Sequence, residues 1–143
     1  TFSKAYGLAG LRVGYGVSST AIAGLLNRVR QPFNVNSMAQ CAAVAALADQ
    51  PQFQANVARI RATRERVVAA LAAGGFEVLP SSANFLFVKP PIAGDQFMTE
   101  LREAGVLVRY FDGARTRDHV RITIGTDEEM DVLLAAPCVR RCD

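Results

Sequence analysis

The chain has few residues of the kinds that hold metals or form disulfides. It contains one histidine, His119, and three cysteines, Cys41, Cys138 and Cys142, whose spacing matches no metal site. The odd number of cysteines favours free thiols in a reducing compartment over a disulfide framework. The sequence therefore predicts no bound metal and a cytoplasmic protein.

Long apolar runs and a strong net charge are also missing. No hydrophobic stretch is long enough for a membrane span, and no segment resembles a signal peptide. The 143 residues carry a formal net charge of +3, half of them are hydrophobic, and the arginines are spread along the chain. Neither a membrane nor a nucleic acid is therefore favoured as a partner. The length and composition indicate one globular domain, or one small domain with part of another.

No acidic residue occurs in the chain before Asp49. Before it, the stretch "TFSKAYGLAGLRVGYG" (1–16) places Lys4 and Arg12 among small and apolar residues with no carboxylate to pair with. Such a lysine could be a solvated loop residue. Alternatively, it loses its proton readily and becomes the neutral amine that forms a Schiff base with an aldehyde.

Hydroxyl and guanidinium groups near Lys4 complete this second interpretation. Thr1 and Ser3 offer hydroxyl donors, and Arg12 offers a two-pronged guanidinium, which together suit a phosphate group. An aldehyde and a phosphate on one molecule describe pyridoxal 5'-phosphate. We therefore expect the unpaired cations of this segment to bind that cofactor.

The first part of the chain, residues 1–51, has signals for a strand over 11–17 and helices over 18–31 and 38–49. Ser37 is expected to cap the second helix, which is alanine-rich and nearly uncharged and is therefore expected to be buried. The chain starts without methionine and enters a patterned segment at once. We therefore expect it to be the carboxy-terminal part of a longer protein.

Residues 52–136 are expected to form a second, small domain that a long helix enters. The order of the signals is α-β-β-α-β-β-α, which indicates helices on one face of a small, mostly antiparallel sheet. The expected elements are a helix over 52–74, strands over 76–80 and 83–90, a helix over 94–105, strands over 106–111 and 119–125, and a last helix over 126–136. Residues 137–143 fit no element and are expected to be disordered.

Several stretches together resemble one family. The first segment, with Ser3-Lys4 followed by Gly10-Leu11-Arg12, resembles the cofactor-attachment segment of fold-type I pyridoxal-phosphate aminotransferases. Four later stretches are similar to histidinol-phosphate aminotransferases in the same order and at about the same spacing: "PFNVNSMAQ", "SSANFLFV", "GVLVRYF" and "HVRITIGTDEEMDVLL". The resemblance covers residues 1–136. It implies an α/β fold in which 1–51 end the large cofactor-binding domain and 52–136 form the small domain.

The resemblance also implies roles for individual residues. Lys4 would hold pyridoxal 5'-phosphate and shuttle the proton between substrate and cofactor, while Thr1, Ser3 and Arg12 would bind the cofactor phosphate. Arg109 and Arg121 would bind the anionic groups of the substrate.

Each of these roles has an alternative. The two arginines could form salt bridges to Asp112, Asp118 or Glu100. Asn84 would order the substrate loop, although a role in forming a turn fits it equally well.

The activity implied is transamination between glutamate and imidazole-acetol phosphate, which gives histidinol phosphate in histidine biosynthesis, by a homodimer. Aromatic amino acid aminotransferases and threonine-phosphate decarboxylases are alternatives with similar stretches. A non-catalytic remnant or interaction domain is an alternative of another class. The family's upstream aspartate, cofactor-contacting tyrosine and phosphate loop have no counterpart in these residues, so we expect the chain alone to be inactive.

Overall fold

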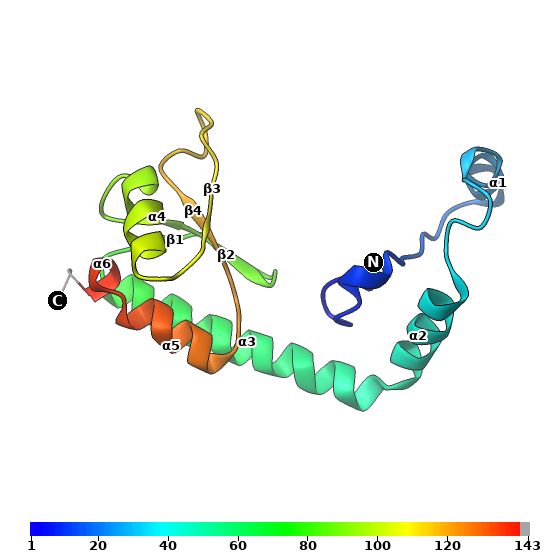
Figure 1. The fold of residues 1–143 in the computed structure, drawn as a ribbon, viewed down its shortest axis with the longest axis horizontal. Helices are drawn as coiled ribbons and strands as arrows, with labels where there is room; N and C mark the ends of the chain where they lie inside the picture. Colours follow the sequence, from blue (N-terminus) through cyan, green and yellow to red (C-terminus); the bar gives the residue numbers. More distant parts are fainter. Residues whose placement is uncertain (141–143) are drawn as a thin grey trace. The chain divides into compact units, whose positions relative to one another are not determined.

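The computed structural model describes residues 1–140 (Figure 1). They divide into two compact units, Thr1–Val57 and the residues from Ala58 onward. The division lies within helix α3 (Gln50–Ala73), the long helix that leads into the second unit. That one unit ends a large domain and the other is a complete small domain stays a prediction. No helix among the described residues is both long and apolar enough to cross a membrane.

The first unit contains the short 3-10 helix η1 (Ala9–Leu11) and the helices α1 (Thr20–Val29) and α2 (Ser37–Ala48). The side chain of the residue before each α-helix caps its first turn. The Ser19 hydroxyl accepts a hydrogen bond from the amide of Ile22 at the start of α1. At the start of α2 the side chain of Asn36, not the expected Ser37, accepts a hydrogen bond from the amide of Ala39, at 2.8 Å. An asparagine caps a helix as well as a serine does, so the helix begins one residue early.

The strand expected over 11–17 does not form. Residues 9–11 make the 3-10 turn, and residues 13–19 lie outside any helix or strand. A strand needs a neighbour that satisfies its backbone groups, and among the described residues of this unit only the bond from the Phe2 amide to the Val13 carbonyl, 3.2 Å, resembles strand pairing. The alternation of large and small residues is therefore not sufficient here.

The expected burial of α2 is also wrong for this chain. Only Ala39 and Ala43 of this helix are buried, whereas Val44 and Leu47 remain exposed. The buried cluster of the unit is small and consists of Phe2, Val13, Ala39 and Ala43. A core of this size covers a single stripe of the helix.

The second unit is built on a four-stranded sheet in the order β1-β2-β4-β3. Every neighbouring pair is antiparallel, as the sequence indicates. Its elements are β1 (Glu77–Val78), β2 (Phe85–Lys89), α4 (Gly94–Glu103), β3 (Arg109–Tyr110), β4 (Val120–Thr123), α5 (Asp127–Ala135) and α6 (Pro137–Arg140). Regular pairing covers only 109–110 and 120–123 of the two longer strands expected there.

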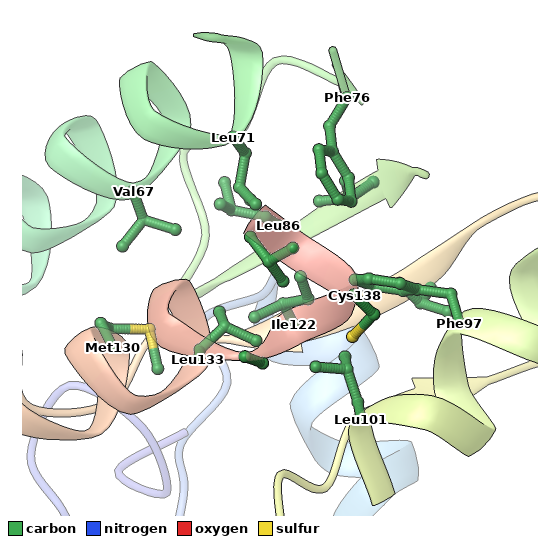
Figure 2. Packing of buried hydrophobic residues seen from close by; sticks show 14 of the residues in the cluster. Val67, Leu71, Phe76, Leu86, Phe97, Leu101, Ile122, Met130, Leu133 and Cys138 are labelled. Carbon is green, nitrogen blue, oxygen red and sulfur yellow. The ribbon is translucent and has the colours of Figure 1, made fainter. Parts of the chain in front are cut away.

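One face of this sheet is buried against helices. Leu86 and Val88 of β2 and Val120 and Ile122 of β4 belong to one buried cluster. Residues from α3, α4, α5 and α6 join the same cluster, so all four helices contribute to the core on that face. Figure 2 shows the side chains of this cluster converging from the strands and helices. The residues between the core positions, among them Phe87 and Arg121, point to the other face because side chains alternate along a strand.

Polar contacts of two α3 residues tie this helix to α5, and the two helices lie side by side (Figure 1). The Thr63 hydroxyl donates a 2.9 Å hydrogen bond to Asp127, and Arg66 forms ion pairs with Asp127 and Asp131. Helix α5 also begins with a capping box, in which Thr126 and Glu129 satisfy each other's backbone amides. The helical side of the unit is thus fixed by packing and by these local bonds.

The expected disordered tail is corrected in part. Pro137–Arg140 form the one-turn helix α6, and Cys138 and Val139 are buried in the core of the second unit. Proline suits the first position of a helix, and two apolar side chains give this turn a reason to pack. The remainder of the predicted tail, 141–143, lies outside the described residues.

Candidate functional site

In the first unit, the segment with Lys4 folds back on itself. The Phe2 amide donates to the Val13 carbonyl and the Leu8 amide donates to the Phe2 carbonyl, at 3.2 and 3.0 Å. A Cβ added at Gly14 would lie only 3.3 Å from the Cα of Thr1, so glycine allows the two ends of the segment to approach. The loop thereby brings Thr1 and its neighbours next to the segment that follows Arg12.

The polar groups of this loop are arranged locally. The Thr1 hydroxyl donates to the Ser3 Oγ at 2.9 Å, and the Ser3 amide donates to Thr1 Oγ1 at 3.2 Å. The Arg12 guanidinium donates to the Ala9 carbonyl through Nη1, at 2.9 Å, and its other donors have no partner within the described part of the chain. Lys4 is exposed, and its amine has no partner within that part either. Hydroxyl, amide and guanidinium donors therefore lie in one short loop without a carboxylate.

The backbone of Arg12 has an unusual conformation. Its φ of +52° lies in the left-handed region, which residues other than glycine rarely adopt. This conformation ends the 3-10 helix η1 at Leu11 and turns the chain at Arg12. Strained backbone of this kind clusters at functional sites, where the surrounding structure holds it. This conformation therefore makes Arg12 a candidate site residue.

In the second unit, two arginines face each other across neighbouring strands. Arg109 of β3 and Arg121 of β4 are directly opposite in the antiparallel register. Their side chains point to the same face of the sheet, which is the face away from the hydrophobic core. Arg109 is exposed and Arg121 is half-buried. Two like charges placed opposite each other destabilise a sheet, so this pair needs a compensating group.

No carboxylate compensates these two charges in the described part of the chain. The ion pairs there belong to Arg66, so the salt bridges of Arg109 or Arg121 to Asp112, Asp118 or Glu100 do not form. The Nε of Arg121 is buried and has no hydrogen-bond partner among the described residues. Leaving a charged donor unsatisfied is costly, which makes this face suitable for an anion.

Aromatic rings surround these guanidinium groups, and the sequence predictions missed them. Arg121 lies over the rings of Phe85 and Phe111, at 5.5 and 5.8 Å from the centroids, and Arg109 lies over Phe111 at 5.3 Å. The sequence contained a signal for the contact between Arg109 and Phe111, because residues two apart on a strand share a face. Two neighbouring rings, Phe87 and His119, stack on each other with centroids 4.8 Å apart.

Asn84 lies at the turn that leads into β2. It is half-buried beside the start of β2, and its backbone carbonyl accepts a hydrogen bond from the amide of Ile124 at 2.9 Å. Ser81 organises the turn before it, since its hydroxyl donates to the Phe85 carbonyl and accepts from the Ala83 amide. These contacts agree with a turn residue. Its role toward a substrate stays a prediction.

Tyr110 of β3 packs against the hydrophobic core, on the opposite face of the sheet from Arg109, and has a raised pKa. Burial of its phenol is the main cause, and the negative charge of Asp112 adds to it. The phenol is therefore protonated at neutral pH. In the first unit, Tyr6 packs against the rings of Phe2 and Phe53, with centroids 5.0 and 4.6 Å apart.

Comparison with known protein families decides the membership of the chain. The family described as aminotransferase class I and II matches residues 1–136. The chain belongs to the class I and II aminotransferases. This membership agrees with the resemblance seen in the sequence and with the α/β fold.

Individual relatives within this family are close. A histidinol-phosphate aminotransferase of Microcystis aeruginosa is 44% identical over 137 residues, which cover 95% of this chain and 39% of the relative. A crystal structure of histidinol-phosphate aminotransferase from Sinorhizobium meliloti in complex with pyridoxal-5'-phosphate matches with a TM-score of 0.86 and 33% identity, over 100% of this chain and 41% of that one. The aminotransferase chain thus spans about two fifths of the length of its relatives.

A relative with another chemistry has a similar fold. The crystal structure of L-threonine-O-3-phosphate decarboxylase from Porphyromonas gingivalis matches with a TM-score of 0.76 and 28% identity, over 95% of this aminotransferase chain and 43% of that one. Fold alone therefore does not distinguish a transaminase from a decarboxylase in this family.

Proposed function

We propose that this chain supplies the cofactor lysine and part of the substrate site of a pyridoxal-phosphate-dependent transaminase. Its proposed substrates are glutamate and imidazole-acetol phosphate, which yield 2-oxoglutarate and histidinol phosphate in histidine biosynthesis. The observation that carries the proposal is the closed loop of residues 1–14, in which the donors of Thr1, Ser3 and Arg12 lie beside an unpaired Lys4. The 44% identity of the chain to a histidinol-phosphate aminotransferase supports the choice of substrate.

The residues of this loop fit pyridoxal phosphate. A phosphate dianion needs charge-assisted donors, and the remaining guanidinium donors of Arg12 and the hydroxyls of Thr1 and Ser3 are of that kind. When bound, the cofactor withdraws electrons from the substrate carbon that carries the amino group. The Nζ of Lys4 would then take the proton from that carbon and pass it to the cofactor. No carboxylate competes for Lys4 within the described residues.

The arginine face of the second unit is proposed to bind the anionic groups of the substrate. Arg121 would donate hydrogen bonds to a carboxylate or phosphate oxygen, and Arg109 would share the charge. Both substrates of the proposed reaction carry such groups, and so does threonine phosphate. Aromatic amino acids carry only the carboxylate. A phosphate-bearing substrate therefore uses both arginines best. The same proposal includes the homodimer that the resemblance implies and the cytoplasmic location that the cysteines indicate.

The cofactor part can be tested on the chain itself, because it contains only two lysines. Incubation with pyridoxal phosphate and reduction with borohydride should label Lys4 in preference to Lys89, which is exposed on β2 and serves as the internal control. Arg12→Ala should reduce the labelling of Lys4 and leave that of Lys89 unchanged, since the guanidinium holds the phosphate and not the aldehyde. Equal labelling of both lysines, insensitive to Arg12→Ala, would contradict the assignment.

The substrate part requires the longer protein that contains this segment. Its turnover with histidinol phosphate should exceed its turnover with aromatic amino acids, and threonine phosphate should release no carbon dioxide. Arg121→Ala should lower kcat/KM for histidinol phosphate and leave the absorbance of the bound cofactor unchanged, because a charge-assisted contact to the substrate is lost. The isolated chain should show no measurable transamination. Activity of the purified chain would refute its dependence on further residues, and preference for another substrate would replace the proposed one.

A further inference from the structure

One aromatic ring contacts both arginines on the open face of the sheet, which is the face away from the hydrophobic core. The Phe111 ring centroid lies 5.3 Å from the guanidinium carbon of Arg109 and 5.8 Å from that of Arg121. Both distances are within the range in which a ring face attracts a cation. The Phe85 ring, in contrast, approaches only Arg121, at 5.5 Å. Phe111 is therefore the ring shared by the two guanidinium groups.

The turn after β3 holds this ring in place. The Phe111 carbonyl accepts hydrogen bonds from the Gly113 amide at 3.0 Å and from the Thr116 hydroxyl at 2.9 Å. A Cβ at Gly113 would lie 2.9 Å from that hydroxyl, so a larger residue there would force the Thr116 side chain to shift. The backbone of Phe111 is thus fixed by bonds that do not involve its side chain, which can be replaced without losing them.

The Phe111 ring offsets the repulsion between the two arginines. Arg109 and Arg121 are directly opposite and repel each other, and no carboxylate among the described residues separates them. In water, two such side chains would turn away from each other. The negative face of an aromatic ring attracts both, and it leaves their N–H donors open because it forms no hydrogen bonds to them. A carboxylate at the same place would occupy those donors.

We propose that Phe111 is a positioning residue that holds Arg109 and Arg121 together, ready to bind one doubly charged phosphate group. This inference rests on the proposed function in one respect, namely that the two arginines are the anion contacts. It goes further by assigning the arrangement of these contacts to a residue that does not itself touch the anion.

The test follows the side-chain Nε–Hε signals of the arginines by NMR while inorganic phosphate is added to the chain at constant ionic strength. Wild-type protein should show saturable shifts of the Arg109 and Arg121 signals. Phe111→Leu should weaken phosphate binding between about threefold and tenfold, because two ring contacts are lost. Phe111→Tyr should bind within about twofold of wild type, because the ring face is kept. Before phosphate is added, Phe111→Leu should already shift both arginine signals, whereas Phe85→Leu should shift only that of Arg121.

The controls separate this inference from the proposed function. Phe33→Leu removes a ring that is 96% exposed and should change neither signal nor affinity. If wild-type protein shows no saturable shift, the arginines are not anion contacts and the substrate part of the proposed function is wrong. If Arg121→Ala abolishes binding but Phe111→Leu binds as wild type does, only the role of Phe111 is overturned. Backbone amide spectra check folding, and Phe111→Met, which keeps a similar volume, replaces Phe111→Leu if its spectrum is disturbed.

Discussion

The two faces of strand β4 should respond differently to substitution. Ile122 is 2% exposed and points into the core, while its neighbour Arg121 points to the open face. Ile122→Ala should lower the unfolding free energy of the second unit by about 2 to 5 kcal/mol, because buried apolar contacts are replaced by a cavity. Ile122→Val should cost about 0.5 to 1.5 kcal/mol. A domain is stable by roughly 5 to 15 kcal/mol, so the larger loss is a sizeable part of the total.

Arg121→Ala should change the unfolding free energy of the second unit by less than about 1 kcal/mol. It removes two ring contacts worth about 0.5 to 1 kcal/mol each at exposed sites. It also relieves a like-charge opposition of about 0.2 to 1 kcal/mol and removes a buried donor without a partner. These effects have opposite signs and largely cancel. The same variant should lose phosphate binding, so stability and binding separate at adjacent residues.

Hydrogen exchange of the β2 and β4 amides measures this free energy locally, which matters because the chain has two units and a single unfolding transition cannot be assumed. Leu107→Ala is the matched control, because its side chain is 82% exposed and its loss should cost less than about 0.5 kcal/mol. If Ile122→Ala costs no more than this control, Ile122 does not pack in the core. A loss of several kcal/mol in Arg121→Ala would show that the arginine stabilises the fold and is not held ready for a ligand.

Two further predictions concern helix α5. Thr126→Ala should lower the stability of the second unit by about 1 kcal/mol in urea titrations, because the helix loses its N-cap; an unchanged midpoint would contradict the capping box. The hydrogen bond from Thr63, followed by that from Arg66, lowers the pKa of Asp127 below its ordinary value of 3.8. The charged form is thus favoured by folding, so its contribution is present above pH 3.8 and is lost as the pH falls through the lowered pKa. Asp127→Asn should flatten the decline in stability there, and an equally steep decline would count against this origin.

The second unit was largely predictable because its signals are local. The Thr126 and Glu129 capping box, the Gly74 and Gly75 helix stop and the alternation in "NFLFV" and "HVRITIG" each act within a few residues. In the structure, Gly75 has a φ of +78° and the Phe76 amide donates to the Leu71 carbonyl, as expected at such a helix end. The antiparallel sheet follows from the same patterns.

The first unit was predicted less well because its signals depend on distant partners. The alternation in 11–17 and the alanine-rich helix over 38–49 indicate a strand and a buried helix only if other segments pair with them and cover them. In the described residues the strand has no neighbour, and Val44 of α2 is 68% exposed. The same dependence explains the misjudged tail, where Cys138 and Val139 pack onto a core that only the folded unit creates.

The sequence by itself determined the chemical character of this protein: an unpaired Lys4 and Arg12 in a glycine-containing loop, and two arginines in apolar strands. It also determined the capping box of α5 and the antiparallel type of the sheet, because those depend on neighbours along the chain. Only the tertiary structure decided that Arg109 and Arg121 stand opposite each other and share the ring of Phe111. The register of two strands separated by a loop depends on how their buried faces pack together, and no pattern within either strand specifies it.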